Sequence, residues 1–321
     1  MIDVLIIGAG PIGLACGLEA KKKGLNYIIV EKGALVNSLY NYPQNMTFFS
    51  SSEKLEIDGI PFISKEAKPS KQEALEYYRR VASSNDLNVN LFEKIENVIT
   101  ENNYYTVISN KDKYMVKNIV ISTGFYDRPN SLNVKGEELN KVSHYYDDPH
   151  FYAMQDVAVI GASNSAVDAA LEVYRKGGNV SIIVRGEEIG KRVKYWVRPD
   201  MINRIKEGSI KAYFNTSVSE IKENELKLYD KLNDNYFTIN NDHVLALTGY
   251  QPDFSFLNNI GINITNDKNK IPYYNDETME TNKKGVYLAG VVCGGMETHK
   301  WFIENSRVHA KMIMENINNF K

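Results

Sequence analysis

Two short glycine-rich turns, each preceded by an apolar strand and followed by a helical pattern, constrain the fold most strongly. The first is Gly8–Gly13, with the spacing Gly-x-Gly-x-x-Gly. The second is Gly161–Ala166, with the looser spacing Gly-x-Ser-x-x-Ala. Strand, tight turn and helix in this order are typical of the βαβ unit that binds nucleotides. The chain is therefore predicted to be an α/β protein with two Rossmann-like nucleotide-binding domains, each of three layers (ββα).

Length, composition and charge agree with this architecture. A chain of 321 residues exceeds the size at which one hydrophobic core usually stays single, so two domains are expected. Apolar residues make up 43% and charged residues 24%, which is typical of a globular rather than a disordered protein. The net charge of −2 leaves no general basic excess. Neither nucleic acid nor a membrane is therefore an expected partner.

Targeting and metal-binding signals are missing from the sequence. No apolar run is long enough to cross a bilayer, and a strand begins within the first few residues. This leaves no room for a signal peptide, so a cytoplasmic location is expected. The two cysteines, Cys16 and Cys293, exclude a disulfide framework, and the five histidines show no ligand spacing. No metal site is expected.

An imperfect duplication links the two halves of the chain. Each glycine turn is followed by a second apolar strand, a polar meander and another apolar strand. That last strand ends in Thr-Gly-aromatic both times, at Thr123–Phe125 and Thr248–Tyr250. In the first half, Tyr114–Val116 and Val120–Thr123 are predicted as separate strands. Also in the first half, Ser70 is predicted to cap a helix that runs to about Ser83.

The three glycines of the first turn have separate roles. Gly8 permits the tight turn, Gly10 lets a pyrophosphate approach the backbone, and Gly13 lets the helix pack close to the strand. Glu31 ends the next strand, where a carboxylate accepts hydrogen bonds from ribose hydroxyls. This favours a cofactor whose adenosine ribose carries no phosphate, FAD or NAD. The alternative is a glycine-rich turn that binds no ligand.

The second turn differs most at the end of its acceptor strand. Ser163 and Ala166 replace two glycines but are small enough for close approach. Arg185 stands where the first half has Glu31, and a guanidinium binds a 2′-phosphate that a carboxylate would repel. Further basic residues follow it, Lys191, Arg192, Lys194 and Arg198. NADPH is favoured over NADH, and the alternative is a solvated face balanced by Glu187 and Glu188.

Two nucleotide sites in one chain imply electron transfer between two cofactors. A nicotinamide donates a hydride, and a flavin is the usual resident acceptor. The N-terminal site is therefore predicted to hold FAD and the second site NADPH.

Several further segments carry a family resemblance over the full length. They are Tyr40–Pro43, Thr47–Ser52, Ile60–Phe62, Ala289–Val291 and Phe302–Asn305. With the two glycine turns, they make the chain resemble the bacillithiol disulfide reductase family within the thioredoxin-reductase-like flavoproteins. The resemblance implies an FAD domain of residues 1–122 and 250–321, into which an NADPH domain of residues 123–249 is inserted.

The glycine turns and the resemblance together define the expected binding residues. Those expected to contact FAD are Gly8, Gly10, Pro11, Gly13, Glu31, Lys32, Asn41, Thr47, Ser50, Thr123, Gly124, Gly290, Val291 and Ile303. Those expected to contact NADPH are Gly161, Ser163, Asn164, Ser165, Ala166, Arg185, Lys191, Arg192, Lys194 and Gly249. Val291 stands where related flavoproteins have an aspartate that binds the ribityl chain.

The redox cysteines of related enzymes have no counterpart at the same places. Thioredoxin reductases carry a Cys-x-x-Cys shortly before the first strand of the NADPH site, and the matching positions here are His144 and Asp147. The resemblance also implies a cysteine after the proline of the first turn, where this chain has Ile12. The catalytic candidates that remain are Cys16, Cys293 and Lys300. For both cysteines, packing in the core is the alternative role.

The expected activity follows from the cofactors and the resemblance. Hydride passes from NADPH to FAD and then to a low-molecular-weight disulfide such as bacillithiol disulfide. One alternative is a ferredoxin- or flavodoxin-NADP reductase, which needs no cysteine. Another is a non-catalytic flavoprotein that senses NADPH. The expected partner is thus a small-molecule disulfide or a redox protein, and the oligomeric state, including a homo-oligomer, stays open.

Overall fold

The computed structural model describes residues 1–319 and divides into two compact units. Unit 1 consists of Met1–Tyr42, Met46–Arg128 and the residues from Tyr250 onwards, whereas unit 2 consists of Pro43–Asn45 and Pro129–Gly249. Unit 2 therefore interrupts unit 1 in the sequence. Each unit has its own sheet, built around parallel strands, and its own buried core, so the predicted α/β class is confirmed.

The sheet of unit 1 combines parallel and antiparallel strands. Its order is β3-β2-β1-β6-β5-β4, with β15 also paired to β6. The strands are β1 Ile2–Ile7, β2 Tyr27–Val30, β3 Val89–Asn90, β4 Ile95–Thr100, β5 Tyr105–Ser109, β6 Lys113–Ile121 and β15 Val286–Leu288. β1 is parallel to β2 and β6, and β15 is parallel to β6, whereas β4 and β5 form an antiparallel meander with β6.

β6 is one continuous strand, so the prediction of two separate strands was wrong. Its first half pairs with β5 and its second half joins β1 and β15. Lys117 and Asn118 look like a polar break in the sequence. Both instead contact Asp3 on β1: the Lys117 Nζ lies 2.9 Å from its carboxylate, and the Asn118 amide donates to its carbonyl at 3.0 Å. Partnered polar residues can continue a strand because their hydrogen bonds are satisfied.

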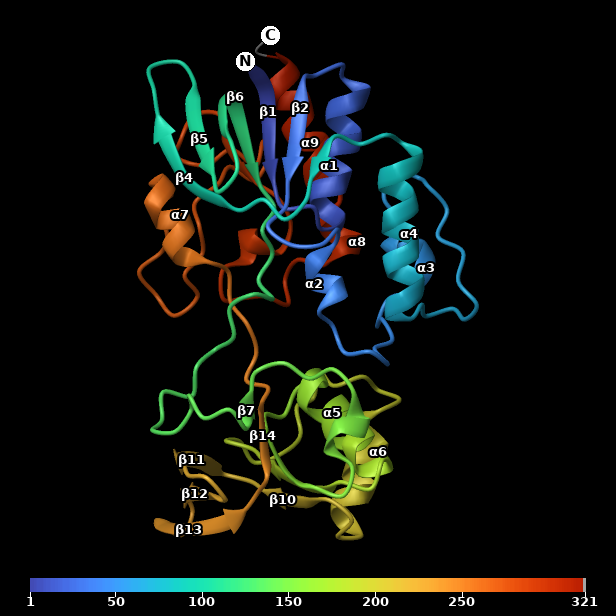
Figure 1. The fold of residues 1–321 in the computed structure, drawn as a ribbon, viewed down its shortest axis with the longest axis vertical. Helices are drawn as coiled ribbons and strands as arrows, with labels where there is room; N and C mark the ends of the chain where they lie inside the picture. The colour runs from blue at the N-terminus through green and yellow to red at the C-terminus, as the bar shows by residue number, and fades with distance from the viewer. Residues whose placement is uncertain (320–321) are drawn as a thin grey trace. The chain divides into compact units, whose positions relative to one another are not determined.

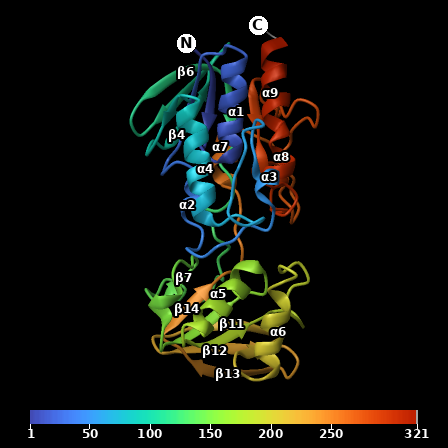
Figure 2. The same cartoon turned by 90° about the vertical axis from the view of Figure 1, so that its right-hand side faces the viewer.

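Helices cover the sheet of unit 1. They are α1 Pro11–Lys22, α2 Asn37–Tyr40, α3 Ser52–Leu55, α4 Lys71–Ser84, α7 Phe254–Ile260, α8 Ile303–Ser306 and α9 Val308–Asn319, and Gly290–Gly294 forms the short 3₁₀ helix η2. α1 and α9 lie side by side, although they come from opposite ends of the chain (Figures 1 and 2). Ser70 caps α4 in a capping box with Glu73, which confirms that prediction. Within residues 1–319, no helix has both the length and the apolar character to span a membrane.

Unit 2 repeats the nucleotide-binding topology with a separate meander. Its parallel sheet has the order β10-β9-β8-β14-β7. The strands are β7 Val142–Ser143, β8 Asp156–Ile160, β9 Asn179–Ile183, β10 Lys211–Tyr213 and β14 His243–Ala246. The antiparallel meander contains β11 Thr216–Ile221, β12 Glu225–Asp230 and β13 Asn235–Asn240. The helices are α5 Asn164–Arg175 and α6 Arg198–Lys206, with the 3₁₀ helix η1 Pro149–Tyr152.

The boundaries of the units differ from the expected ones at one crossing. The second crossing, between Gly249 and Tyr250, lies where it is expected, but residues 123–128 cluster with unit 1 rather than unit 2. Tyr126 explains the difference, because its ring packs against Tyr42 at 4.8 Å and Tyr250 at 4.4 Å between centroids.

A short loop segment, Pro43–Asn45, belongs to unit 2 by its contacts. The Gln44 N–H donates to the Asp147 carbonyl at 3.1 Å, and the Asn45 amide donates to the Glu172 carboxylate at 3.3 Å. Unit 2 therefore contains these three residues as well as the long segment Pro129–Gly249.

Candidate functional site

The first glycine turn joins β1 to α1 and lies against the end of β6. A Cβ on Gly8, whose φ is +105°, would lie 2.7 Å from the Ser122 carbonyl oxygen. A Cβ on Gly13 would lie 1.9 Å from the Gly8 carbonyl oxygen, so neither position accepts a side chain. At Gly10, in contrast, no described atom lies within 4 Å of a Cβ. The turn is thus closely packed on one side and open on the other.

The open side of this turn is the start of α1. Gly10 is the N-cap residue, and no described side chain caps the helix. The first N–H groups of a helix have no partner within the helix and carry the positive end of its dipole. This arrangement suits the pyrophosphate of a dinucleotide.

Glu31 closes the site at the end of β2. Its carboxylate accepts hydrogen bonds from the Ala9 N–H at 2.8 Å and the Gly33 N–H at 2.9 Å. The residue is only 6% exposed, and this burial raises the pKa of Glu31, against the lowering effect of the two N–H groups. A carboxylate has further lone pairs, so it can still accept ribose hydroxyls. The neighbouring Lys32 has its ammonium 2.8 Å from the Asp127 carboxylate.

The parallel strands bring several predicted residues to one edge of the sheet. β1, β2, β6 and β15 run in the same direction, so the residues that follow them meet at their carboxyl ends. These residues are Gly8, Glu31, Thr123, Gly124 and Gly290. Ligands of open α/β sheets bind at this edge.

The C-terminal segment contacts the first turn directly. A Cβ on Gly290 would lie 3.2 Å from Ile12 Cγ1, so the backbone of the η2 turn packs on the Ile12 side chain. Val291 follows within η2, and Ile303 begins α8 and packs, partly buried, against the core. The Gly290 N–H donates to Nδ1 of His309 at 3.2 Å.

Three loop residues predicted to contact FAD have contacts within the protein. The Asn41 amide donates to the Asn37 carbonyl at 2.8 Å, and the Ser50 hydroxyl donates to the Glu304 carboxylate at 2.7 Å. Thr47 forms an isolated β-bridge with the N-cap residue of α4. The geometry therefore gives these residues a part in holding the loop, and their contact with a flavin stays a prediction.

The second glycine turn joins β8 to α5 and packs against the end of β14. A Cβ on Gly161, whose φ is +139°, would lie 2.5 Å from the Leu247 carbonyl oxygen and 3.0 Å from Ala166 Cβ. Ser163 is the N-cap residue of α5, and no described side chain caps this helix either. The first N–H groups of α5, Ser165 among them, are thus arranged like those of α1. Gly249 follows β14 with φ +90°.

The loop after β9 is tied to the second turn by Asn164 and Lys194. The Asn164 side-chain oxygen Oδ1 accepts the Lys194 N–H at 2.8 Å, and the side-chain amide of Asn164 donates to the Arg192 backbone carbonyl at 3.3 Å. Lys194 is buried, and its ammonium lies 2.7 Å from the Asp168 carboxylate. The Lys194 charge is therefore neutralised by Asp168 within unit 2, and this ion pair holds the loop against α5.

The remaining basic residues of this loop differ in their partners. The ammonium of Lys191 and the guanidinium of Arg198 lie 3.3 Å and 3.0 Å from the Glu188 carboxylate. Arg185 and Arg192 are exposed, and within residues 1–319 neither forms an ion pair. Their guanidiniums therefore have no carboxylate partner among the described residues.

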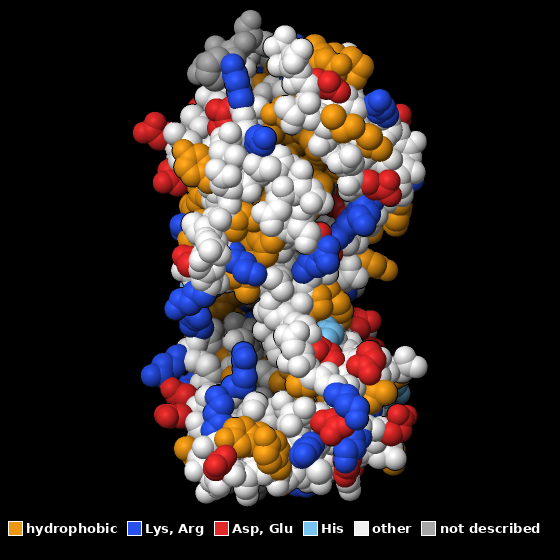
Figure 3. Space-filling view, turned by 90° about the vertical axis from the view of Figure 1, so that its left-hand side faces the viewer, with side chains coloured by type: hydrophobic (Ala, Val, Ile, Leu, Met, Phe, Trp, Pro, Cys, Tyr) orange, Lys and Arg blue, Asp and Glu red, His pale blue; other side chains and the backbone are white. Residues whose placement is uncertain are grey.

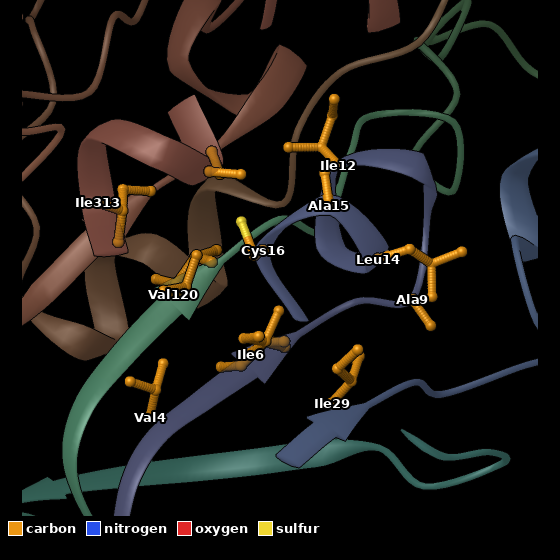
Figure 4. Close-up of a cluster of buried hydrophobic side chains, with 14 of the residues drawn as sticks. Val4, Ile6, Ala9, Ile12, Leu14, Ala15, Cys16, Ile29, Val120 and Ile313 are labelled. Carbon is orange, nitrogen blue, oxygen red and sulfur yellow. The ribbon is translucent and has the colours of Figure 1, made fainter. Parts of the chain in front are cut away.

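The catalytic candidates are not arranged as reactive groups. Cys16 and Cys293 are fully buried, and burial raises the pKa of both thiols, that of Cys16 to about 12. Figure 4 shows the Cys16 sulfur among apolar side chains, with Val120 and Ile313 close by. A thiolate is the reactive form, so burial disfavours a redox role for either cysteine. Lys300 is exposed, with its ammonium 5.5 Å from the centre of the Trp301 ring.

Sequence reasoning missed three residues that shape the site: Ser122, Asp168 and His309. The Ser122 hydroxyl oxygen lies 3.0 Å from both the Ile7 and the Gly8 carbonyl oxygens, which share its one proton. A polar residue at the end of an apolar strand was the available signal for Ser122. For Asp168 the signal was an acid one helical turn after Asn164. For His309 it was a lone imidazole on the apolar face of the last helix.

The described residues contain no cluster of three or more His, Cys, Asp or Glu side chains that could hold a metal ion.

Lys and Arg side chains are intermixed with Asp and Glu on the face in Figure 3. Charges of both signs therefore lie near one another on this face.

Comparisons with known proteins extend over both units. A sequence model of the pyridine nucleotide-disulphide oxidoreductase family matches residues 5–290. Bacilliredoxin reductase Bdr of Bacillus subtilis is 43% identical over 314 residues, 98% of this chain and 96% of that protein. Bacillithiol disulfide reductase Bdr (YpdA) from Staphylococcus aureus has a TM-score of 0.97 at 41% identity, covering 100% of this chain and 99% of that one. A thioredoxin reductase of T. acidophilum, 19% identical with a TM-score of 0.78, covers 99% and 98% of the two chains and shows a common fold.

Proposed function

This chain belongs to the bacillithiol disulfide reductase family, within the thioredoxin-reductase-like pyridine nucleotide-disulphide oxidoreductases, and on this premise we propose its reaction. It is an oxidoreductase, and FAD and NADPH are the cofactors of its family. The proposed reaction carries electrons from NADPH through FAD to a low-molecular-weight disulfide such as bacillithiol disulfide.

The opposite charges at the ends of β2 and β9 carry this proposal. In unit 1, buried Glu31 stands beside an open helix start, which suits the unphosphorylated ribose and the pyrophosphate of FAD. In unit 2, exposed Arg185 and Arg192 stand beside a second open helix start, which suits the 2′-phosphate and pyrophosphate of NADPH. Unit 1 is therefore proposed as the FAD domain and unit 2 as the NADPH domain.

The reaction balances without a protein thiol. When bound, FAD would supply an acceptor for the hydride of NADPH and a two-electron donor for the disulfide. One NADPH and one proton then reduce one disulfide to two thiols and leave NADP⁺. Asn164 and Lys194 position the basic loop on α5, and Arg185 and Arg192 bind the phosphate. Burial of Cys16 and Cys293 favours reduction of the acceptor without a thiolate relay.

The same burial favours a second candidate, a ferredoxin- or flavodoxin-NADP reductase. Such an enzyme transfers electrons to a redox protein and needs no cysteine. A flavoprotein that only senses NADPH would share the cofactor sites but would not consume NADPH with any acceptor.

One experiment separates these functions. The purified protein is mixed with NADPH, and NADPH oxidation is followed in parallel with bacillithiol disulfide, ferredoxin, flavodoxin or oxygen. The proposal predicts the highest kcat/KM with the disulfide. A higher value with ferredoxin or flavodoxin would favour the second candidate, and no oxidation with any acceptor would favour the sensor. The Cys16→Ala, Cys293→Ala double variant is expected to retain disulfide turnover. Loss of disulfide turnover in this variant would instead support a mechanism in which a thiolate relays the electrons.

A further inference from the structure

A buried histidine lies behind the C-terminal turn that contacts the first glycine turn. His309 is in the first turn of α9 and only 2% exposed. Its Nδ1 accepts the Gly290 N–H at 3.2 Å, and the Cys293 sulfur lies 3.9 Å from the same atom. The Trp301 ring stands edge-on against the imidazole, with centroids 4.6 Å apart. The Nδ1 of His309 thus contacts the first and the fourth residue of the turn Gly290–Gly294.

The donor at this contact determines the form of the imidazole. A backbone N–H can only donate, so Nδ1 must be unprotonated and the ring proton must be on Nε2. Burial favours the same neutral form and lowers the pKa of His309 to about 4. Without this acceptor, the Gly290 N–H would be buried and unpaired, which is costly.

The turn held by His309 is also a wall of the first nucleotide site. The preceding residue, Ala289, donates its N–H to the Ile121 carbonyl at 2.9 Å, so the turn starts at the carboxyl edge of the sheet. Gly290 has φ +84°, and its backbone packs on Ile12 in the first turn of α1. The interior therefore anchors one side of Gly290, and its other side lies against the helix start proposed to bind FAD.

From these contacts we infer that His309 is a positioning residue for the flavin. Its neutral imidazole holds the Gly290–Gly294 turn against Ile12 in the conformation that FAD requires. This inference rests on the proposed assignment of FAD to unit 1. His309 does not touch the cofactor and acts through the backbone of Gly290.

The test compares two substitutions that differ in the acceptor. In His309→Asn, the amide oxygen is the same number of bonds from Cα as Nδ1 and can accept the Gly290 N–H. In His309→Leu, an apolar side chain of similar size has no acceptor. Ile317→Ala is the packing control, because it removes a buried side chain about 12 Å further along α9. The FAD dissociation constant, the visible flavin spectrum and the unfolding midpoint are measured for each protein after cofactor removal and reconstitution.

We expect His309→Leu to bind FAD roughly tenfold to a hundredfold more weakly and with an altered spectrum. His309→Asn should bind FAD within about threefold of wild type, and Ile317→Ala should lose stability but keep its FAD affinity. Wild-type affinity and spectrum in His309→Leu would overturn the inference while leaving FAD in place. Equal weakening in the Asn variant or the Ile317→Ala control would assign the effect to packing and overturn it too.

Two further outcomes separate the inference from the proposed function. If the wild-type protein neither contains nor takes up FAD, the proposed function itself fails. If His309→Leu does not fold, ¹⁵N histidine NMR of the wild-type holoenzyme decides. An unprotonated Nδ1 in an Nε2–H tautomer supports the inference, and an Nδ1–H tautomer or an imidazolium at neutral pH contradicts it.

Discussion

In both glycine turns a helix packs closely against the turn that precedes it, but the two turns differ in the space they leave for a side chain. At Gly13, a Cβ would overlap the Gly8 carbonyl oxygen at 1.9 Å, so this helix approaches the turn backbone to backbone. The equivalent residue of the second turn is Ala166, whose Cβ is accommodated and fully buried. The strict Gly-x-Gly-x-x-Gly spacing therefore marks the closer approach. The looser spacing marks a turn with room for one methyl group.

The charged residues at the two sites differ in burial as well as in sign. Glu31 is buried and bonded to two backbone N–H groups, whereas Arg185 is exposed. A buried, pre-organised carboxylate suits a cofactor that stays bound through many turnovers. An exposed guanidinium suits a coenzyme that binds and leaves in each cycle. The comparison thus supports a resident nucleotide in unit 1 and an exchanging one in unit 2.

The largest expected effect comes from changing the closely packed residue at the third position of each glycine turn. Gly13→Ala should destabilise unit 1 by about 3 kcal/mol or more and abolish FAD binding, because the new methyl group meets backbone. The opposite change in unit 2, Ala166→Gly, should cost only about 0.5–1 kcal/mol. Chemical unfolding and the FAD content of the purified proteins measure both. Equal effects of the two substitutions would remove the distinction between the turns.

Acid should weaken unit 1 through His309. Its pKa is lowered from 6.5 to about 4 by burial, so the unfolded chain takes up a proton before the folded one does. The stability from His309 is fully present above pH 6.5 and is lost as the pH falls to about 4, a change of about 3 kcal/mol. His309→Asn should lack this loss, and comparing the two proteins cancels all other titrations.

The measurement can be confined to unit 1. The two tryptophans are Trp196 in unit 2 and Trp301 in unit 1, so a Trp196→Phe background leaves Trp301 as the reporter. Unfolding is then followed at pH 7 and pH 4 with and without His309→Asn. An identical pH dependence in both proteins would show that His309 is not held neutral.

A smaller effect is expected from Arg185. Arg185→Ala should raise the KM for NADPH roughly tenfold to a hundredfold and leave that for NADH unchanged, because only NADPH carries the 2′-phosphate. Lys222→Ala is a matched control, since Lys222 is also basic and in unit 2 but pairs with Glu225 next to the meander. An unchanged KM for NADPH in Arg185→Ala would refute the assignment.

The smallest effect is expected from Glu188, which holds Lys191 and Arg198. Glu188→Gln should remove the ion pairs of both cations and lower the KM for NADPH by about twofold to threefold, as expected for exposed ion pairs. Glu187→Gln removes the same charge from the neighbouring position and is the control. An equal change in both variants would indicate a general charge effect rather than release of these cations.

The parts of the site that could be predicted depend on local sequence. The two turns, Glu31 and Arg185 follow from the order strand, turn, helix, strand, because a βαβ unit sets where the second strand must end. The same locality allowed Ser70 to be identified as the cap of α4. The roles of these site residues as ligands of FAD and NADPH stay predictions.

The parts that could not be predicted depend on contacts distant in sequence. Lys194 looks like one more basic residue of the loop, yet its ammonium is bound by Asp168 and buried. β6 looks like two strands until Asp3 supplies partners for its polar middle. His309 gains its partner only when the last helix packs beside α1. In each case tertiary structure supplies the partner that local patterns omit.

The interrupted order of unit 1 has a consequence for synthesis on the ribosome. β15 completes the sheet beside β6, and α9 covers α1, but both follow the whole of unit 2 in the chain. Domains generally fold as units while the chain emerges. Unit 2 can therefore fold first, while the N-terminal strands wait with one sheet edge and one helix face uncovered. The nascent chain is expected to acquire protease resistance in unit 2 before unit 1, the reverse of the order in which the two units begin.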